Sequence, residues 1–457
     1  MQKMEFSSFR DPSGVVFEED GKIYRQINTI YMPQYKKFME SGLAQELQSS
    51  RMLIRHWETN APCINEAGAL VIQAERIPYV SYIYEWSFGQ IKDAALLTLK
   101  MHRKALDAGM ILKDASAYNI QFLHGRPIMI DTLSFDFYTP GEPWVAYGQF
   151  CRHFLAPLLL MRYTDIRLNR LMELFIDGIP LDAAAALLCG KGGLFAKQHI
   201  DSYAKSISKH SADGKAAEQS KTKAASLPLS LHISLIEAMI RGIEALELKN
   251  VQTEWSDYYQ HTNYSASASD NKLKLVFEVL SAIRPSMVWD LGANDGRYSK
   301  AALDVGASVV AFDIDPIAVE RNYSEAKRNG TEMLPLVLDL TNPSPGIGFA
   351  NQERKTIDQR RRPDCILMLA VIHHLAISNN LPFRQIAKWL SQMTEDLMIE
   401  LVPKEDSQVQ ILLATRADIF PNYTREDFVT TFSEFFELRS EEQIGDSKRT
   451  LYHFHVR

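Results

Sequence analysis

The sequence predicts an α/β protein whose C-terminal half is a parallel sheet wound with helices. A mixed α+β region and a group of helices precede that half. From Met287 onward, short apolar runs alternate with amphipathic stretches, which is typical of parallel strands joined by helices. Residues 1–144 mix strand-like runs with helical stretches, and residues 145–200 carry apolar side chains at helical spacing.

Composition indicates an ordinary globular chain. The 457 residues are 46% hydrophobic and 23% charged, and 50 Lys+Arg against 56 Asp+Glu give a net charge of -6. This balance argues against a nucleic-acid coat or a polybasic membrane binder. The four cysteines are far apart, so neither a structural zinc site nor a disulfide framework is expected. The first residues lack a signal-peptide core, and the apolar run at 154–161 is too short to span a bilayer. We therefore expect a cytoplasmic protein that does not enter the membrane.

The chain divides at a polar stretch. Residues 201–227 are rich in Lys, Ser and Ala and hold almost no large apolar groups, so they predict a flexible linker. The expected domains are 1–144 as an α+β domain, 145–250 as a helical connector containing the linker, and 251–457 as the α/β domain. Amphipathic helices are expected over 229–248 and 270–283.

A glycine turn opens the C-terminal sheet. The apolar strand Met287–Leu291 runs into the sequence GANDG, and a helix follows. Glycines here let the backbone approach a ligand at the carboxyl end of a strand. The next strand, 308–312, closes on Asp313, about twenty residues after Gly292, where a ribose diol needs a bidentate acceptor.

The remaining elements follow in order. A helix is expected with Asp315 as its cap, Pro316 at its first position and Gly330 past its end. Strands are then expected at 336–338, 364–369 and 396–401, helices around Gln410 and over 425–432, and terminal strands near 436–438 and 451–455.

Four motifs that occur in order in the C-terminal half resemble those of a known enzyme family. The sequence DLGANDG, then FDID, then LDL, then an apolar strand ending in HH resembles the class I S-adenosylmethionine-dependent methyltransferases over residues 255–457. The glycines do not form GxGxxG, and Asp295 would repel a pyrophosphate but suit an ammonium group. Residues 255–276 and 400–428 are closer to a bacterial group that includes nodulation-associated methyltransferases. The resemblance implies a Rossmann-like seven-stranded sheet and S-adenosylmethionine as cofactor.

The resemblance also implies roles for individual residues. The methionine portion of the cofactor would lie against Asp290, Gly292, Ala293, Asn294 and Asp295. Asp313 would hold the ribose hydroxyls, and Ile314 would lie against the adenine face. Asp339 would accept from the adenine amino group with Leu340 packed beside it, and Ala370 with Val371 would form the floor near the sulfonium. Tyr259, Tyr264 and Lys274 would form a lid, although aromatic packing alone also explains the tyrosines.

Methyl transfer needs a nucleophile on the methyl axis and, for a protonated nucleophile, a base. His373 and His374 follow the fourth strand and suit that task, while the alternative is that one imidazole only positions the other. The motifs typical of adenine N6, glutamine amide, pyrimidine C5 and metal-dependent catechol methylation are absent. Metal-free O- or N-methylation of a small-molecule or glycan acceptor is therefore expected.

Two rival functions stay open. One is RNA or protein methylation, in which a basic insertion formed by Arg354 and Arg360–Arg362 would bind the substrate. We favour a solvated loop for this insertion, and we do not favour a nucleic-acid partner. The other is a scaffold that binds the cofactor without turnover.

The N-terminal region carries a second pattern. Asp114 and Asn119 have the spacing D-x-x-x-x-N, and Asp131 follows a hairpin, which resembles protein-kinase-like and aminoglycoside-phosphotransferase-like folds. No glycine-rich phosphate loop and no strand lysine are evident, and DTL stands in place of DFG. We expect a kinase-like domain that does not transfer phosphate and instead shapes or covers the acceptor site.

Overall fold

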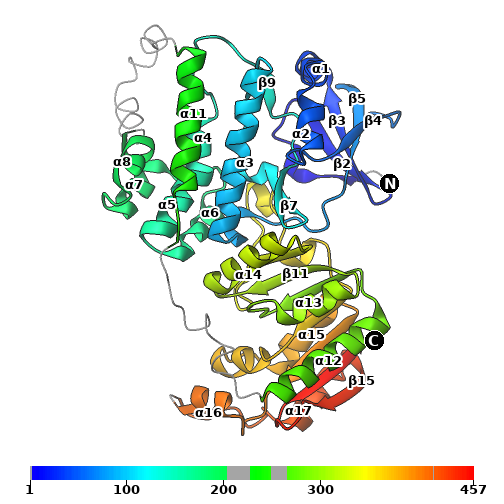
Figure 1. Cartoon of the computed structure of the whole chain (residues 1–457). Helices are drawn as coiled ribbons and strands as arrows, with labels where there is room; N and C mark the ends of the chain where they lie inside the picture. Colours follow the sequence, from blue (N-terminus) through cyan, green and yellow to red (C-terminus); the bar gives the residue numbers. More distant parts are fainter. Residues whose placement is uncertain (1–2, 203–226, 249–264, 415) are drawn as a thin grey trace. The chain divides into compact units, whose positions relative to one another are not determined.

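A computed structural model describes residues 3–202, 227–248, 265–414 and 416–457. The chain forms two compact units, shown in Figure 1: unit 1 is Met1–Asn250 with Pro345–Lys355, and unit 2 is Val251–Ser344 with Thr356–Arg457. Helices and strands mix in both, so the prediction of an α/β protein is confirmed. The helices expected as a separate connector belong to unit 1, and the expected linker lies almost wholly outside the described residues.

Unit 1 contains an antiparallel sheet of five strands among the described residues, in the order β1-β2-β3-β5-β4. Its strands are β1 (Lys3–Met4), β2 (Gly14–Glu19), β3 (Lys22–Asn28), β4 (His56–Thr59) and β5 (Gly68–Ala74). The turn between β2 and β3 is Asp20-Gly21, with both residues at positive φ (49° and 74°). Asp-Gly is favoured in such a turn because both residues tolerate the left-handed conformation, so the hairpin register is fixed locally.

Two separate antiparallel strand pairs also lie among the described residues of unit 1. They pair β6 (Met110–Leu112) with β9 (Phe135–Phe137) and β7 (Ile120–Leu123) with β8 (Arg126–Met129). The turn at His124-Gly125 has positive φ at both residues, which confirms the predicted hairpin before Asp131.

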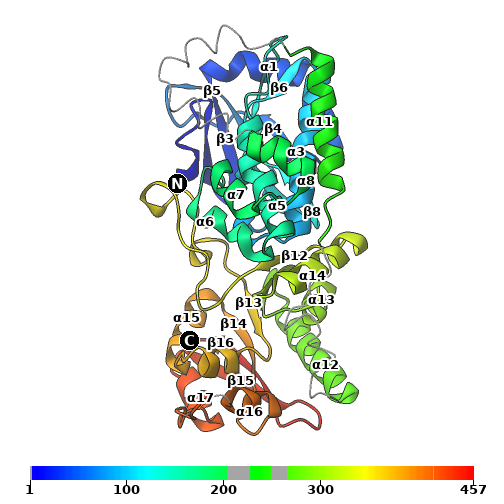
Figure 2. The same cartoon turned by 90° about the vertical axis from the view of Figure 1, so that its left-hand side faces the viewer.

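The longest helix described in unit 1 is α3 (Phe88–Asp107), which begins at a capping box formed by Ser87 and Gln90. Helix α11 (Leu229–Glu244) packs along α3, and α5 packs against both α3 and α7 (Figure 2). The others are α1 (Met32–Glu40), α2 (Leu43–Ser49), α4 (Tyr147–Phe150), α5 (Ala156–Tyr163), α6 (Leu171–Leu174), α7 (Leu181–Leu188) and α8 (Gly193–Ala196).

Unit 2 is built on a sheet of seven strands in the order β12-β11-β10-β13-β14-β16-β15. The strands are β10 (Met287–Leu291), β11 (Ser308–Asp313), β12 (Met333–Val337), β13 (Cys365–Met368), β14 (Asp396–Leu401), β15 (Phe436–Gln443) and β16 (Thr450–Val456). The first five in this order are parallel, and β16 and β15 are antiparallel. The carboxyl ends of β10, β11 and β12 therefore meet at one edge.

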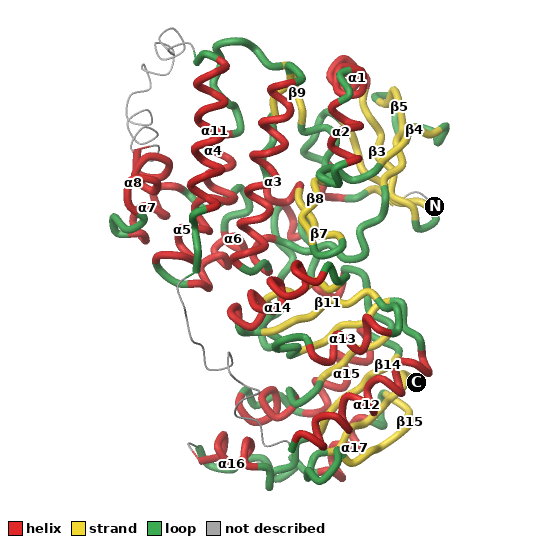
Figure 3. The backbone as a smooth tube through the Cα atoms, viewed as in Figure 1, coloured by secondary structure: helices red, strands yellow, loops and turns green. Residues whose placement is uncertain are grey.

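Helices cover both faces of this sheet (Figure 3). One face packs against α12 (Ala266–Ile283), α13 (Arg297–Asp304) and α14 (Pro316–Asn329). On the other, Phe428 and Phe432 of α17 (Arg425–Phe432) pack on Phe454, and Phe428 also contacts Phe383 of α15 (Phe383–Met393). Helix α16 (Ser407–Ala414) follows β14. Among the described helices, none combines the length and apolar character that crossing a bilayer requires.

Candidate functional site

The glycine turn lies at the carboxyl end of β10. Gly292, Asn294 and Gly296 all have positive φ, at 84°, 49° and 73°. A Cβ on Gly292 would lie 2.3 Å from Cγ2 of Val371, in the loop after β13. Residue 292 must therefore be glycine both for its backbone conformation and for the close approach of that loop.

Two buried carboxylates flank this turn. Asp313 accepts hydrogen bonds from the N–H groups of Asn294 (2.8 Å) and Asp315 (2.9 Å), and Asp290 accepts one from the Ser299 hydroxyl (2.7 Å). Burial raises the pKa of each to about 6, even though the hydrogen bonds favour the charged forms. A ligand that brings further hydrogen-bond donors or a positive charge would stabilise the ionised form of these buried carboxylates.

The other residues expected at the cofactor lie in the segments that follow β10, β11, β12 and β13. Asp339 follows β12, one residue after Leu338, whose N–H donates to the Asp313 carbonyl (2.8 Å). The Asp339 carboxylate accepts from the N–H and hydroxyl of Thr341, at 2.8 and 2.6 Å. These contacts stabilise a local turn, so a structural role in that turn would also explain the aspartate at position 339. Of the remainder, Ala293 and Ala370 are buried, Leu340 is half-buried, and Asp295 and Ile314 are exposed.

The two histidines follow β13 with ring centroids 4.1 Å apart. His373 is 1% exposed, and its Nδ1 has no hydrogen-bond partner among the described residues. Burial, with the charge of Arg449 also acting, lowers the pKa of His374 to about 4 and that of His373 well below its ordinary value. Both imidazoles are therefore neutral at physiological pH, and His373 presents a buried nitrogen without a partner.

A buried ionic network, which sequence reasoning missed, joins α12 to β14. Lys272 Nζ lies 2.5 Å from Glu400 Oε2 and 4.4 Å from the centroid of the Tyr298 ring. Arg449 Nη1 lies 3.3 Å from Glu400 Oε1, and its Nε lies 2.8 Å from Asp406 Oδ2. The two positive and two negative charges balance, so the network contributes no net charge to the site.

One signal for this network was present in the sequence. Lys272 stands at four-residue spacing between Ala268 and Val276, both fully buried, on the apolar stripe of its helix. A lysine on such a stripe requires a buried partner, but the sequence does not identify which one.

The expected lid is only partly described. Lys274 has a side chain that is 72% exposed and lies 3.7 Å from Glu278 on the same helix. Tyr259 and Tyr264 lie outside the described residues.

The basic insertion does not form one solvated loop. The guanidinium of Arg354 lies 3.9 Å from the centroid of the Tyr118 ring within unit 1, and Arg360 in unit 2 is 7% exposed. Arg361 and Arg362 are exposed. The expectation of a solvated loop is therefore wrong for Arg354 and Arg360, because ring stacking and burial hold them.

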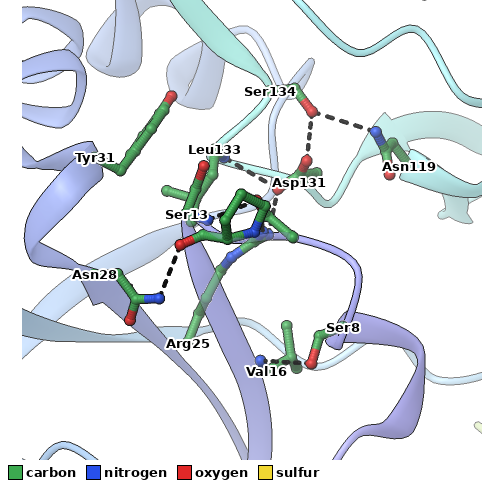
Figure 4. Close-up of polar contacts among 12 residues, drawn as sticks. Ser8, Ser13, Val16, Arg25, Asn28, Tyr31, Asn119, Asp131, Leu133 and Ser134 are labelled. Atoms are coloured by element: carbon green, nitrogen blue, oxygen red, sulfur yellow. Dashed lines mark hydrogen bonds and ion pairs between the residues drawn. The ribbon is translucent and has the colours of Figure 1, made fainter. Parts of the chain in front are cut away.

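A second polar cluster lies in unit 1 (Figure 4). The Asp131 carboxylate accepts from the Ser134 hydroxyl (2.5 Å) and the Leu133 N–H (3.0 Å) and pairs with Arg25 of β3. Ser134 Oγ accepts in turn from Asn119 (3.2 Å). Burial would raise the pKa of Asp131, but Arg25 and these hydrogen bonds outweigh it, and the pKa is lowered.

The remaining aspartates of this cluster are also engaged. Asp114 accepts from the Ser116 N–H (2.9 Å) and the Gln149 amide (2.8 Å), and burial together with Asp131 raises its pKa. Asp11 Oδ2 lies 2.7 Å from Nη2 of Arg25. Arg25 was not foreseen, although its place between Ile23 and Ile27 on one face of the strand was a usable signal. Within the described ranges, no group of three or more His, Cys, Asp or Glu side chains is arranged to hold a metal ion.

Comparison with known proteins gives one extended match. No family model matches the chain. Nodulation protein NoeA of Rhizobium meliloti (strain 1021) is 33% identical over 455 residues, which cover 98% of this chain and 95% of that protein.

Two methyltransferases of known structure each match less than half of the chain. Magnesium protoporphyrin IX methyltransferase from Synechocystis PCC 6803, solved with bound SAH, matches 44% of this chain and 93% of its own, with 15% identity and a TM-score of 0.32. The N-methyltransferase NodS from Bradyrhizobium japonicum WM9 matches 42% of this chain and 98% of its own, with 13% identity and a TM-score of 0.32.

Proposed function

The chain belongs to the family of nodulation protein NoeA, and we propose that it is an S-adenosylmethionine-dependent methyltransferase. Its acceptor is an oxygen or nitrogen nucleophile of a small molecule or glycan. The observation that carries this proposal is the pair of buried carboxylates, Asp290 and Asp313, beside a turn that tolerates only glycine at position 292.

The residues present fit this cofactor. A ribose diol brings two hydroxyl donors to Asp313, whose two oxygens keep lone pairs beyond those that accept from the backbone N–H groups. An ammonium group brings a positive charge toward Asp290 and Asp295. Each contact offsets the cost of holding a buried carboxylate ionised.

When bound, the cofactor supplies a methyl group activated by its sulfonium. The chain's task is to orient the acceptor and to remove its proton if it has one. Burial keeps His373 and His374 in the unprotonated form that a base needs, and their lowered pKa makes them weak bases suited only to a nucleophile that loses its proton readily. Nδ1 of His373 is the nitrogen that has no partner within the described residues. We assign the base to this pair.

We further propose that unit 1 transfers no phosphate. Phosphoryl transfer needs a metal ion on carboxylates of the Asp131 type. Here the guanidinium of Arg25 already neutralises Asp131 and also binds Asp11, so a divalent ion would have to displace an internal cation.

Transfer of labelled methyl groups from S-adenosylmethionine into a fractionated cell extract tests the main proposal and isolates the acceptor. Calorimetry with S-adenosylmethionine and its demethylated product, SAH, tests the cofactor independently. Asp313→Ala should weaken binding by at least tenfold, since hydrogen bonds to a charged group contribute about 1.5–3 kcal/mol. Wild-type affinity in that variant would exclude the ribose assignment. Binding without transfer to any fraction would indicate a scaffold, and transfer to the RNA or protein fraction would identify a macromolecular acceptor.

A further inference from the structure

The chain that follows β13 links the glycine turn to the histidine pair and then forms a short helix. Val371 approaches Gly292 of the turn, and His373 and His374 come two residues later. A single turn of π-helix, η11 (His374–Ser378), begins at the second histidine. Its last residue therefore lies about one helical turn, roughly 5 Å along the axis, beyond the backbone of that histidine. A side chain at the end of η11 can thus contact the same small ligand as the histidines.

Arg416 holds the end of η11. Its Nη1 donates to the carbonyl oxygens of Ile377 and Ser378, and its Nη2 donates to Oδ1 of Asn380 at 2.7 Å. The guanidinium also lies over the Phe420 ring, with Cζ 4.9 Å from the ring centroid. These contacts join the chain that follows β14 to the chain that follows β13, and both strands end at the carboxyl edge of the sheet. The guanidinium is therefore fixed on the side of the sheet where the proposed base lies.

The charge of this guanidinium has no acidic partner in the part of the chain that the structure describes. Its contacts are two carbonyls, an amide oxygen and a ring. The nearby charges of Lys404 and Asp418 pair with each other at 2.8 and 2.9 Å. Since a guanidinium has five N–H groups, three hydrogen bonds leave one N–H on Nε and one on Nη2. These two nitrogens form the fork that binds a carboxylate, sulfate or phosphate.

We infer that Arg416 binds an acidic group of the methyl acceptor, so the acceptor is a small molecule or glycan that carries a carboxylate, sulfate or phosphate. This inference rests on the proposed function. Asp290 and Asp313 then present negative charge to the cofactor near the ends of β10 and β11, whereas Arg416 presents positive charge to the acceptor. An acidic group held at a fixed guanidinium orients the acceptor, and orientation is the main requirement of an in-line methyl transfer.

The first test compares full-length Arg416→Met and Arg416→Lys with the wild type. Arg384→Met is the matched control, since Arg384 of α15 also lies over a ring, that of Phe435 at 5.9 Å, and pairs with Glu434 at 2.9 Å. Methyl transfer is measured with the acceptor fraction purified from the cell extract, and SAH affinity is measured by calorimetry. We expect the KM for the acceptor to rise about tenfold or more in Arg416→Met, with kcat changed by less than about threefold.

The variants separate recognition from positioning. Arg416→Lys should give an intermediate KM, because it keeps the charge but loses the fork, and SAH affinity should be unchanged in every variant. A fall in kcat with an unchanged KM would overturn the inference, because Arg416 would then only hold η11 and its histidines. An equal rise in KM in Arg384→Met would also overturn it, since the effect would then not be specific to this guanidinium.

The charge of the wild-type product tests the acceptor class directly, and it decides the matter if neither Arg416 variant folds. The labelled product should bind an anion exchanger at about pH 8, where carboxylates, sulfates and phosphates are ionised. Loss of retention at about pH 2 identifies a carboxylate, loss after phosphatase treatment identifies a phosphate, and retention through both identifies a sulfate. A neutral or cationic product would overturn the inference.

A further measurement needs no acceptor and uses inorganic sulfate as the probe. Hydrogen exchange of the peptide 374–381 is followed in sodium sulfate and in sodium chloride at equal ionic strength. Sulfate should slow this exchange in the wild type but not in Arg416→Met, because the bound anion fixes the guanidinium that holds η11. An equal effect of sulfate in both proteins would refute the anion site. Slower exchange in the wild type alone, without methyl transfer to any fraction, would support the anion site and refute the proposed function.

Discussion

Asp313→Asn should make the free protein more stable while it weakens cofactor binding. The carboxylate of Asp313 is buried, and its pKa is raised from 3.8 to about 6. Since each tenfold change in an equilibrium constant corresponds to about 1.4 kcal/mol, the ionised form costs about 3 kcal/mol in the folded state. Asparagine has nearly the same shape and cannot ionise, so it escapes this cost.

The direction with pH follows from the raised pKa. The folded state holds the proton more tightly than the unfolded chain, so the contribution of Asp313 to stability is present below pH 4 and is lost as pH rises to about 6. Asparagine keeps one acceptor for the two N–H donors of Asn294 and Asp315, and the lost hydrogen bond costs about 1 kcal/mol. The net gain in the free energy of unfolding is about 1–2 kcal/mol at pH 7.5, and it disappears near pH 4.5.

Urea unfolding of unit 2 at these two pH values measures the gain, and calorimetry with SAH measures the loss of binding, expected to be at least tenfold. Asp304→Asn is the control, since Asp304 is an exposed aspartate at the end of α13 in the same unit. Equal stability differences at both pH values would refute the account, because the effect would then not come from ionisation. A less stable variant at pH 7.5 would show that the hydrogen bonds outweigh the burial of charge.

Three further predictions concern other residues. His373→Asn or His374→Asn should slow turnover about a hundredfold with SAH affinity nearly unchanged, whereas loss of both binding and stability would show a structural pair. Gly292→Ala should abolish SAH binding and lower the melting temperature of unit 2, because its Cβ would meet Val371. Gly306→Ala, with a similar φ of 89° and open space around its Cβ, isolates the cost of the backbone conformation alone. ATP with magnesium should not raise the melting temperature of wild-type protein; stabilisation that disappears in Asp131→Asn would overturn our view of unit 1.

Local features of the fold could be predicted from the sequence. Helix α14 begins at Pro316 with Asp315 as its cap and ends at Gly330, as expected, because these signals act within a few residues of the helix ends. The strands Met287–Leu291 and Asp396–Leu401 also have the expected bounds. For this helix and for these two strands, the residues that determine the bounds are close together in the chain.

Pairings between distant residues could not be predicted in this way. Nothing near Lys272 identifies Glu400 as its partner, and nothing near Arg25 points to Asp131, which is 106 residues away. The sequence predicted Arg354 in a solvated loop because the pattern shows its charge. The pattern does not show that the Tyr118 ring packs against the Arg354 guanidinium. Such contacts depend on how the elements pack, and a pattern of residue types does not contain that information.

The charge of the unit 2 site favours one class of ligand over another. Lys272 and Arg449 are each paired with buried carboxylates, so they leave no positive charge free for an anion. Both histidines are neutral at pH 7, whereas Asp290 and Asp313, with pKa values near 6, are largely ionised there. A dinucleotide would bring two phosphate charges toward these two carboxylates, where repulsion is stronger than in water. An ammonium and a sulfonium would be attracted by the same two carboxylates, which supports the proposed cofactor over a dinucleotide.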